Sequence, residues 1–161
     1  MERLWSPWRA KYIASGVDSQ SDRCVFCDIA ANPDQDDTNF VVHRSKLGFV
    51  VLNLFPYITG HLLVIPYEHT SEFATVAKEI TDELMDLCKQ SQAALHAVYS
   101  PPGFNVGINL GAAAGAGIVD HLHIHVLPRW PGDTNFMTTI SESRVIPENL
   151  ETTYSKLRSR F

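Results

Sequence analysis

Three histidines alternate with apolar residues near the C-terminal end of the chain, at His121, His123 and His125. Side chains of an extended strand point alternately to its two faces, so a strand over 121–127 places the three imidazoles on one face. An imidazole can act as nucleophile, acid, base or metal ligand near neutral pH. The spacing therefore predicts a strand whose histidine face does chemistry. A polar strand face that happens to be rich in histidine is the alternative.

The segments on either side of these histidines support a chemical role. Residues 111–117 read Gly-Ala-Ala-Ala-Gly-Ala-Gly, and loops of small residues let backbone N–H groups approach an anion closely. Downstream, Pro128 is expected to end the strand, with Arg129 and Trp130 at the rim of the site. This order of segments predicts a phosphate site beside a nucleophilic histidine.

Length and composition indicate one soluble globular domain. The chain has 161 residues, of which 45% are hydrophobic and 19% charged, and its net charge is −5. A negative charge argues against a broad nucleic-acid surface. No apolar stretch approaches the roughly 20 residues that cross a membrane, and the N-terminal residues do not resemble a signal peptide. We therefore expect a cytoplasmic protein with a small-molecule substrate and neither nucleic-acid nor membrane partners.

Hydrophobic patterning predicts an α+β fold in which one long helix packs on a five-stranded, mostly antiparallel sheet. The strands are expected to follow one another as a meander. Their predicted ranges are 39–43, 47–53, 61–66, 104–110 and 121–127.

Helical spacing of apolar residues predicts the long helix over 80–99, and a short helix is expected near 147–159. We treat residues 1–161 as a single domain. Within it, residues 1–23 form an N-terminal arm anchored by two tryptophans, and residues 131–161 form a C-terminal extension.

Two segments of the chain together resemble the histidine triad (HIT) superfamily. One is the triad itself, and the other is 60–69, Gly-His-Leu-Leu-Val-Ile-Pro-Tyr-Glu-His. Within that superfamily the chain is similar to the bacterial diadenosine tetraphosphate phosphorylase group, and three further segments carry this likeness. They are Leu-Trp-Ser-Pro-Trp-Arg at 4–9, Phe-Asn-Val-Gly-Ile-Asn-Leu-Gly at 104–111 and Pro-Arg-Trp-Pro-Gly-Asp-Thr-Asn-Phe at 128–136. The resemblance implies a HIT-like fold and a homodimer, or higher homo-oligomer, paired through the long helix and an edge strand.

The resemblance also implies nucleotidyl transfer from diadenosine tetraphosphate or a related phosphoanhydride. His123 would attack the α-phosphate and carry a covalent nucleotidyl intermediate, for which its Nδ1 must keep a proton so that Nε2 is free. His125 would donate to a phosphoryl oxygen or to the leaving group. His61 would position the triad or its phosphate, or serve only as a structural histidine.

Eight residues are expected to bind the nucleotide. Asn53 stands where relatives bind the ribose, whereas the other seven are candidates for an apolar base slot or for phosphate contacts. The base-slot candidates are Phe26, Ile29 and Leu54, and the phosphate candidates are Asn109, Gly115, Ala116 and Gly117. Magnesium can accompany the substrate, although the imidazole nucleophile does not require it.

Gly117 departs from the pattern of the superfamily. Four residues before the first triad histidine, HIT hydrolases often have Gln and the phosphorylase group has Ser, whereas Gly117 offers only its backbone N–H. Two acceptors for the nucleotidyl group thus stay open. Water gives hydrolysis, and inorganic phosphate, admitted by a roomier loop, gives phosphorolysis.

Cys24 and Cys27 form a C-x-x-C pair, which is half of a tetrahedral zinc site. Resemblance to zinc-bearing HIT proteins implies that His69 and His121 complete a structural Zn²⁺ site. The ion would then fix the start of the catalytic strand without taking part in the reaction. Two ordinary buried cysteines, or a redox pair, are the alternatives.

Three other functions compete with the leading one. An adenosine phosphoramidate hydrolase is the nearest enzyme. A nucleotide-binding regulator with little turnover, or a module in which all three histidines bind metal, belongs to a different class. Replacing His123 with Asn separates an enzyme from a nucleotide-binding regulator, since an enzyme would keep binding the nucleotide and lose turnover.

Overall fold

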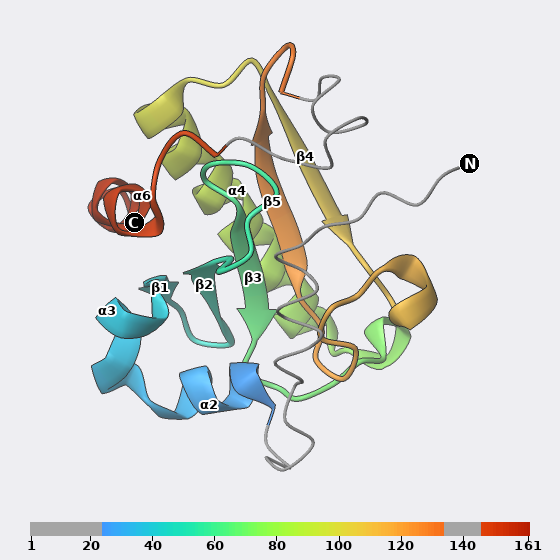
Figure 1. Cartoon of the computed structure of the whole chain (residues 1–161). Coiled ribbons are helices and arrows are strands. Elements are labelled where there is room, and N and C mark those ends of the chain that lie inside the picture. The colour runs from blue at the N-terminus through green and yellow to red at the C-terminus, as the bar shows by residue number, and fades with distance from the viewer. Residues whose placement is uncertain (1–23, 134–145) are drawn as a thin grey trace, which may run out of the picture.

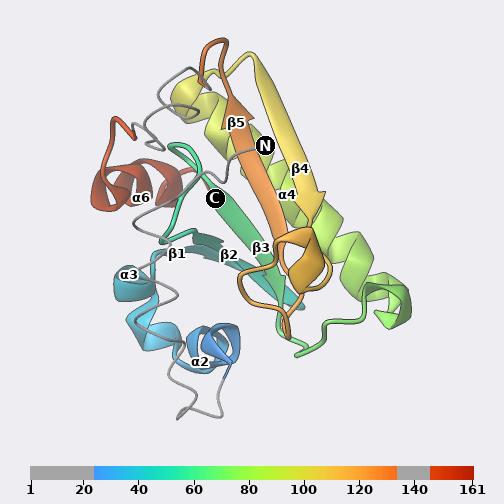
Figure 2. The ribbon, with the colours of Figure 1, turned by 45° about the vertical axis from the view of Figure 1, so that its right-hand side comes forward.

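The computed structural model describes residues 24–133 and 146–161. A five-stranded sheet forms the centre, and the long helix α4 (Lys78–Tyr99) runs across one of its faces (Figures 1 and 2). On the opposite face lies the short helix α2 (Val25–Ala31), followed by α3 (Asp36–Asn39). The predicted α+β fold is confirmed. The two short helices carry no sequence prediction.

All neighbouring strands of the sheet are antiparallel, and their spatial order is β1-β2-β3-β5-β4. Their bounds are β1 (Val41–Arg44), β2 (Gly48–Leu52), β3 (Leu62–Pro66), β4 (Gly103–Ile108) and β5 (Ile124–Arg129). The predicted meander is therefore wrong, because β5 inserts between β3 and β4. After β3 and helix α4, the chain forms β4 one strand position away from β3, and β5 later occupies the position between them. This insertion brings the triad beside the strand that His61 precedes.

Strand β5 begins later and ends later than predicted. Residues 121–123 precede it, and Pro128 lies inside it rather than ending it. Proline cannot donate a ladder hydrogen bond, but pairing with β3 ends at Val126, and Pro128 lies opposite Phe104 of β4. Among the described strands, β5 therefore has a neighbour on only one side at the position of the missing N–H.

The sheet has a hydrophobic core on each face. Strands β2 and β3 are buried throughout, and alternate side chains point to opposite faces. The α4 face includes Val50, Leu62 and Leu95, whereas Phe49 and Phe26 meet on the α2 face. Burial on both faces explains why these strands are continuous apolar runs.

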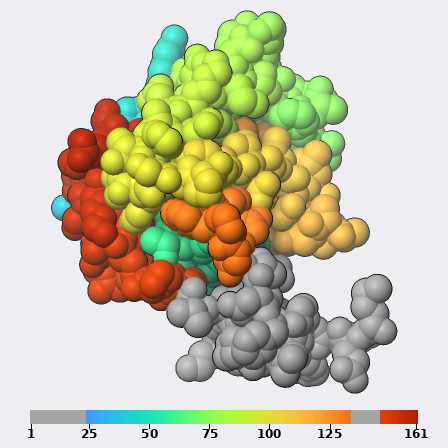
Figure 3. Space-filling model, turned by 90° about the horizontal axis from the view of Figure 1, so that it is seen from above, coloured from blue at the N-terminus to red at the C-terminus, as the bar shows by residue number. Residues whose placement is uncertain are grey.

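The remaining described elements connect the strands or cover their ends. Three 3₁₀ turns, η1 (Pro33–Gln35), η2 (Phe73–Thr75) and η3 (Ala112–Ala114), precede the C-terminal helix α6 (Leu150–Arg158). Helix α6 (red) lies beside the C-terminal end of α4 (yellow) when the molecule is seen from above (Figure 3). The predicted arm over 1–23 and residues 134–145 of the predicted extension lie outside the described residues. Within the described ranges, no helix is long and apolar enough to span a membrane.

Candidate active site and metal centre

The three triad histidines are buried in a row at the start of β5. They are 1% (His121), 5% (His123) and 7% (His125) exposed, and the ring centroids of His123 and His125 are 5.0 Å apart. His61, which is fully buried, immediately precedes the neighbouring strand β3. The structure thus brings together, at the starts of these two strands, the four histidines that the sequence singles out.

The proton on His123 can be placed from its hydrogen bond. Its Nδ1 lies 2.9 Å from the backbone carbonyl oxygen of His121, and a carbonyl can only accept. Nδ1 therefore carries the proton, and Nε2 keeps its lone pair. Burial lowers the pKa of His123, which favours the neutral ring. This is the tautomer that a nucleophilic Nε2 requires.

A second chain of hydrogen bonds places the proton on His125. The backbone N–H of Tyr57 donates to His61 Nδ1 at 3.1 Å, so the His61 proton is on Nε2. That Nε2 lies 2.9 Å from His125 Nδ1 and donates to it. His125 must then carry its own proton on Nε2. This buried Nε2 has no hydrogen-bond partner among the described residues, which leaves it available to an incoming ligand.

The loop between β2 and β3 sets the position of His61. The Asn53 amide nitrogen lies 3.2 Å from His61 Nδ1, and its Oδ1 accepts the Phe55 N–H at 3.0 Å. Gly60 ends the loop at φ +78°, a conformation that favours glycine, and a Cβ there would lie 2.8 Å from a methyl carbon of Leu95. The loop therefore fixes His61 through both its turn geometry and its hydrogen bonds.

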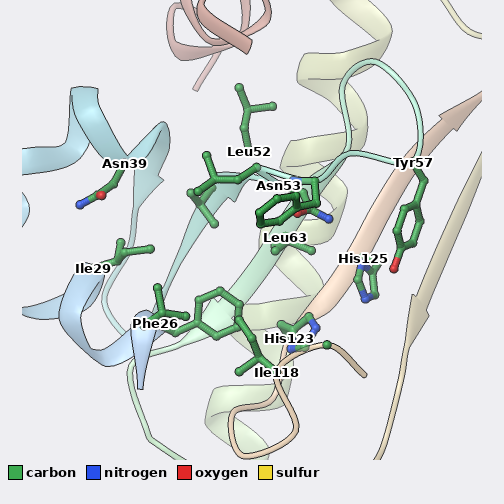
Figure 4. A pocket seen from close by; sticks show the side chains of 15 residues that line it. Phe26, Ile29, Asn39, Leu52, Asn53, Tyr57, Leu63, Ile118, His123 and His125 are labelled. Atoms are coloured by element: carbon green, nitrogen blue, oxygen red, sulfur yellow. Dashed lines mark hydrogen bonds between the residues drawn. The ribbon is translucent and has the colours of Figure 1, made fainter. Parts of the chain in front are cut away.

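A pocket of about 200 Å³ opens in front of His123 and His125. It contains five of the predicted nucleotide-binding residues, namely Phe26, Ile29, Asn53, Leu54 and Gly117. Figure 4 shows Phe26 and Ile29 of α2 along one side and the two histidines at the other. An apolar slot thus leads to a polar end with histidine nitrogens.

Three predicted nucleotide-binding residues lie outside the pocket lining, and some lining residues carry no sequence prediction. Asn109, Gly115 and Ala116 do not line the pocket; they lie beyond the end of β4, around η3. Among the lining residues that sequence reasoning missed are Asn39 and Ile118. No motif marks these two, because α3 and the loop before the triad reach the pocket only through the tertiary fold.

The four predicted metal ligands converge in the structure. One ligand atom from each of Cys24, Cys27, His69 and His121 lies within 4.8 Å of all the others. His121 Nδ1 is 3.2 Å from Cys24 Sγ, 3.6 Å from Cys27 Sγ and 3.3 Å from His69 Nδ1. Zn–S bonds of about 2.3 Å and Zn–N bonds of about 2.0–2.1 Å give tetrahedral edges of roughly 3.3–3.8 Å. The separations therefore fit a tetrahedral zinc ion.

The protonation of His121 also fits a metal. Its Nε2 lies 2.9 Å from the backbone carbonyl oxygen of Pro66 and donates to it. Nδ1 is then free to bind an ion, with the carbonyl as the outer partner that orients the ring. Burial, with Cys24 nearby, raises the pKa of Cys27, so binding a metal would release a proton there.

The metal centre and the pocket share helix α2. Cys24 is the N-cap of α2 and Cys27 lies in its first turn. Phe26, between them, lines the pocket and has its ring centroid 5.5 Å from that of His121 and 5.3 Å from that of His123. The candidate metal ligands and the Phe26 ring that contacts His123 therefore lie at the same end of α2.

Comparison with known proteins identifies the family. The HIT domain model matches residues 34–132, which run from η1 to just past the end of β5. The chain belongs to the HIT domain family. Cys24 and Cys27 lie before the matched range.

Three relatives show how far the likeness extends. The chain is 42% identical to AP-4-A phosphorylase of Mycobacterium tuberculosis (strain ATCC 25618 / H37Rv) over 167 residues, which covers 100% of this chain and 85% of that protein. It is 30% identical to the asymmetrical bis(5'-nucleosyl)-tetraphosphatase of Schizosaccharomyces pombe over 75% of this chain and 63% of that one. A crystal structure of a Zn-bound histidine triad family protein from Mycobacterium smegmatis matches with a TM-score of 0.69 and 29% identity, covering 85% and 91% of the two chains.

Proposed function

We propose that this HIT domain enzyme transfers a nucleotidyl group from diadenosine tetraphosphate through a covalent intermediate on His123. One observation carries the proposal: the hydrogen bonds leave a lone pair on His123 Nε2 and a proton on His125 Nε2, and both residues line one pocket. A nucleophile and a donor are thus presented to the same bound group. The 42% identity to AP-4-A phosphorylase supports this choice of substrate.

The reaction consists of two displacements at phosphorus. In the first, His123 Nε2 forms a bond to the α-phosphorus, the bond to the bridging oxygen breaks, and ATP leaves. His125 Nε2–H donates to the phosphoryl group or to the departing oxygen. The phosphorylated imidazole becomes cationic, and its Nδ1–H bond to the His121 carbonyl, 2.9 Å long in this structure, stabilises that charge.

The acceptor completes the second displacement. Inorganic phosphate gives ADP and water gives AMP, and His123 returns to its neutral form in both cases. Gly117 lines the pocket beside His123 without a side chain, which leaves room for phosphate. We therefore favour phosphorolysis. No Asp or Glu is among the described pocket-lining residues, so magnesium would enter on the phosphates of the substrate.

Product analysis tests this function. Purified protein is incubated with diadenosine tetraphosphate, with and without inorganic phosphate, and the products are separated by anion exchange. We expect ADP and ATP only with phosphate. AMP and ATP without phosphate would establish a hydrolase instead. Release of AMP from an adenosine phosphoramidate, with no reaction of the tetraphosphate, would support the alternative enzyme.

We further propose that Cys24, Cys27, His69 and His121 hold a structural zinc ion. The support is the tetrahedral fit of these four side chains, together with the Zn-bound M. smegmatis neighbour. When bound, the ion would crosslink α2, the segment after β3 and the start of the triad. It would touch none of the reacting atoms.

A homodimer is the proposed assembly. Strand β4 lies at one edge of the sheet, and Val106 on it is 49% exposed. Met85 on the outer side of α4 is 50% exposed. An edge strand with exposed apolar residues is suited to pairing with a second copy. Light scattering coupled to gel filtration measures this directly, and a mass of one chain would contradict it.

A further inference from the structure

Helix α2 forms one wall of the pocket, yet its position depends on contacts at its two ends. Val25, Phe26 and Ile29 of α2 face the pocket. The N-terminal end carries the two cysteines of the metal centre. At the C-terminal end, the side chains of Asn32 and of Arg44 on β1 donate to backbone carbonyls of α2, and neither of them lines the pocket.

Arg44 binds the last carbonyl groups of α2. One guanidinium nitrogen donates to the Ile29 carbonyl oxygen at 2.7 Å, and another donates to the Ala30 carbonyl oxygen at 3.3 Å. The last carbonyls of a helix have no partner within it and carry the negative end of its dipole. A cation with several donors satisfies both needs at once. Arg44 thus caps the helix that forms the pocket wall.

The same guanidinium also holds α3. Its Nε lies 2.9 and 3.0 Å from the two carboxylate oxygens of Asp36, and a second nitrogen lies 2.6 Å from one of them. Asp36 begins α3, and Asn39 at the other end of that helix lines the pocket. One side chain on the sheet therefore sets the relative positions of two pocket walls.

The surroundings of Arg44 partly shield its contacts from solvent. Its side chain is 19% exposed and that of Asp36 is 22% exposed. The guanidinium carbon also lies 5.5 Å from the centre of the Phe49 ring. A bidentate, partly buried pair is worth more than a surface pair because solvent screens it less. The ion pair between Arg158 of α6 and Asp37 is more exposed than this pair, because its two side chains are 51% and 74% exposed.

We propose that Arg44 is the positioning residue for nucleotide affinity: it holds α2 and α3 at the spacing that admits the base. This rests on the proposed nucleotide-binding function. Arg44 acts through Ile29 and Asn39 and does not touch the reacting phosphorus. Contacts to the base are the same in the bound substrate and in the transition state, so their loss raises KM and leaves kcat unchanged.

The test compares Arg44→Met and Arg44→Lys with the matched control Arg158→Met. We expect Arg44→Met to raise KM for diadenosine tetraphosphate by about tenfold or more, since hydrogen bonds to a charged group are the strong ones. The kcat should stay within about threefold of wild type. Arg44→Lys keeps the charge but loses the several planar N–H donors of the guanidinium group, and should give an intermediate KM. Arg158→Met should have the KM and kcat of wild type, because it removes only the exposed ion pair between α6 and Asp37 of α3.

Binding without turnover gives an independent readout. In a His123→Asn background, titration calorimetry with diadenosine tetraphosphate should show the same rise in Kd for Arg44→Met. If Arg44→Met does not fold, Asp36→Asn replaces it; that variant keeps the Arg44 cap on α2 and should raise KM by a smaller factor.

Two results overturn the proposal separately from the proposed function. Unchanged KM and Kd in Arg44→Met, or a lower kcat at unchanged KM, would show that Arg44 does not set nucleotide affinity while the enzyme itself still binds and reacts. A wild-type protein that neither binds nor cleaves the nucleotide would overturn the proposed function and this inference with it.

Discussion

His61 Nε2 lies 2.9 Å from His125 Nδ1, and this contact determines which nitrogen of His125 carries the proton. His61 has its own proton fixed by the Tyr57 N–H. The Tyr57 N–H donates to His61 and His61 donates to His125. The His125 Nε2–H then has no acceptor among the described residues. A backbone amide in a loop thereby sets which nitrogen of His125 carries the proton.

Replacing His61 tests this order of donors. His61→Met removes the donor to His125, so the His125 proton can move to Nδ1, and we expect kcat to fall about tenfold or more. His61→Gln retains an amide N–H and should lose less. Single-turnover rates measure the effect, and nitrogen chemical shifts of His125 report its tautomer. Equal losses in the two variants, with an unchanged tautomer, would argue against the role of His61.

His123→Asn should abolish the covalent intermediate and leave the pocket intact. The asparagine side chain is polar and smaller than the imidazole and has no nucleophilic nitrogen, so we expect turnover to fall by at least about a thousandfold. Quenching a reaction with substrate labelled at the α-phosphate should yield labelled wild-type protein and unlabelled variant. A variant that still becomes labelled would show that the nucleotide is carried elsewhere.

Stability should fall in acid because of His125. Burial, with His123 nearby, lowers its pKa from 6.5 to about 4, so the unfolded chain binds the proton first as the pH falls. The contribution of His125 to the free energy of unfolding is complete above about pH 6.5 and is lost as the pH drops to 4. It amounts to about 3 kcal/mol at most. Urea unfolding at pH 7.5 and 4.5 measures it. His125→Gln should show a shallower dependence on pH than wild type, and an equal one would contradict this assignment.

The placement of the triad histidines could be predicted because its signal is local. Alternation over seven residues places His121, His123 and His125 together whatever the rest of the chain does. The insertion of β5 between β3 and β4 has no such signal, since strand order depends on pairing between distant segments. Helix α2 went unpredicted for a related reason: it is seven residues long, and its apolar face is defined by the sheet on which it packs.

The candidate site divides in the same way. Phe26, Ile29 and Gly117 reach the pocket as expected. Asn109 and Gly115 are predicted phosphate contacts, and the fold places them outside the pocket lining. Arg44 belongs to no motif, because its importance comes from two helix ends that only the tertiary structure brings to it.

Zinc should be present at one ion per chain and should stabilise the fold. Cys24→Ser and Cys27→Ser each remove a thiolate, and we expect metal content below half an ion per chain and a Tm lower by about 5 °C or more, because metal binding contributes directly to folding. Cys88→Ala is the matched control: Cys88 is 4% exposed in the core beside α4, outside the metal cluster. Its loss should lower Tm through a cavity and leave zinc content at one. Elemental analysis and thermal unfolding distinguish the two cases. Full zinc content in both serine variants would mean that the ion is held elsewhere.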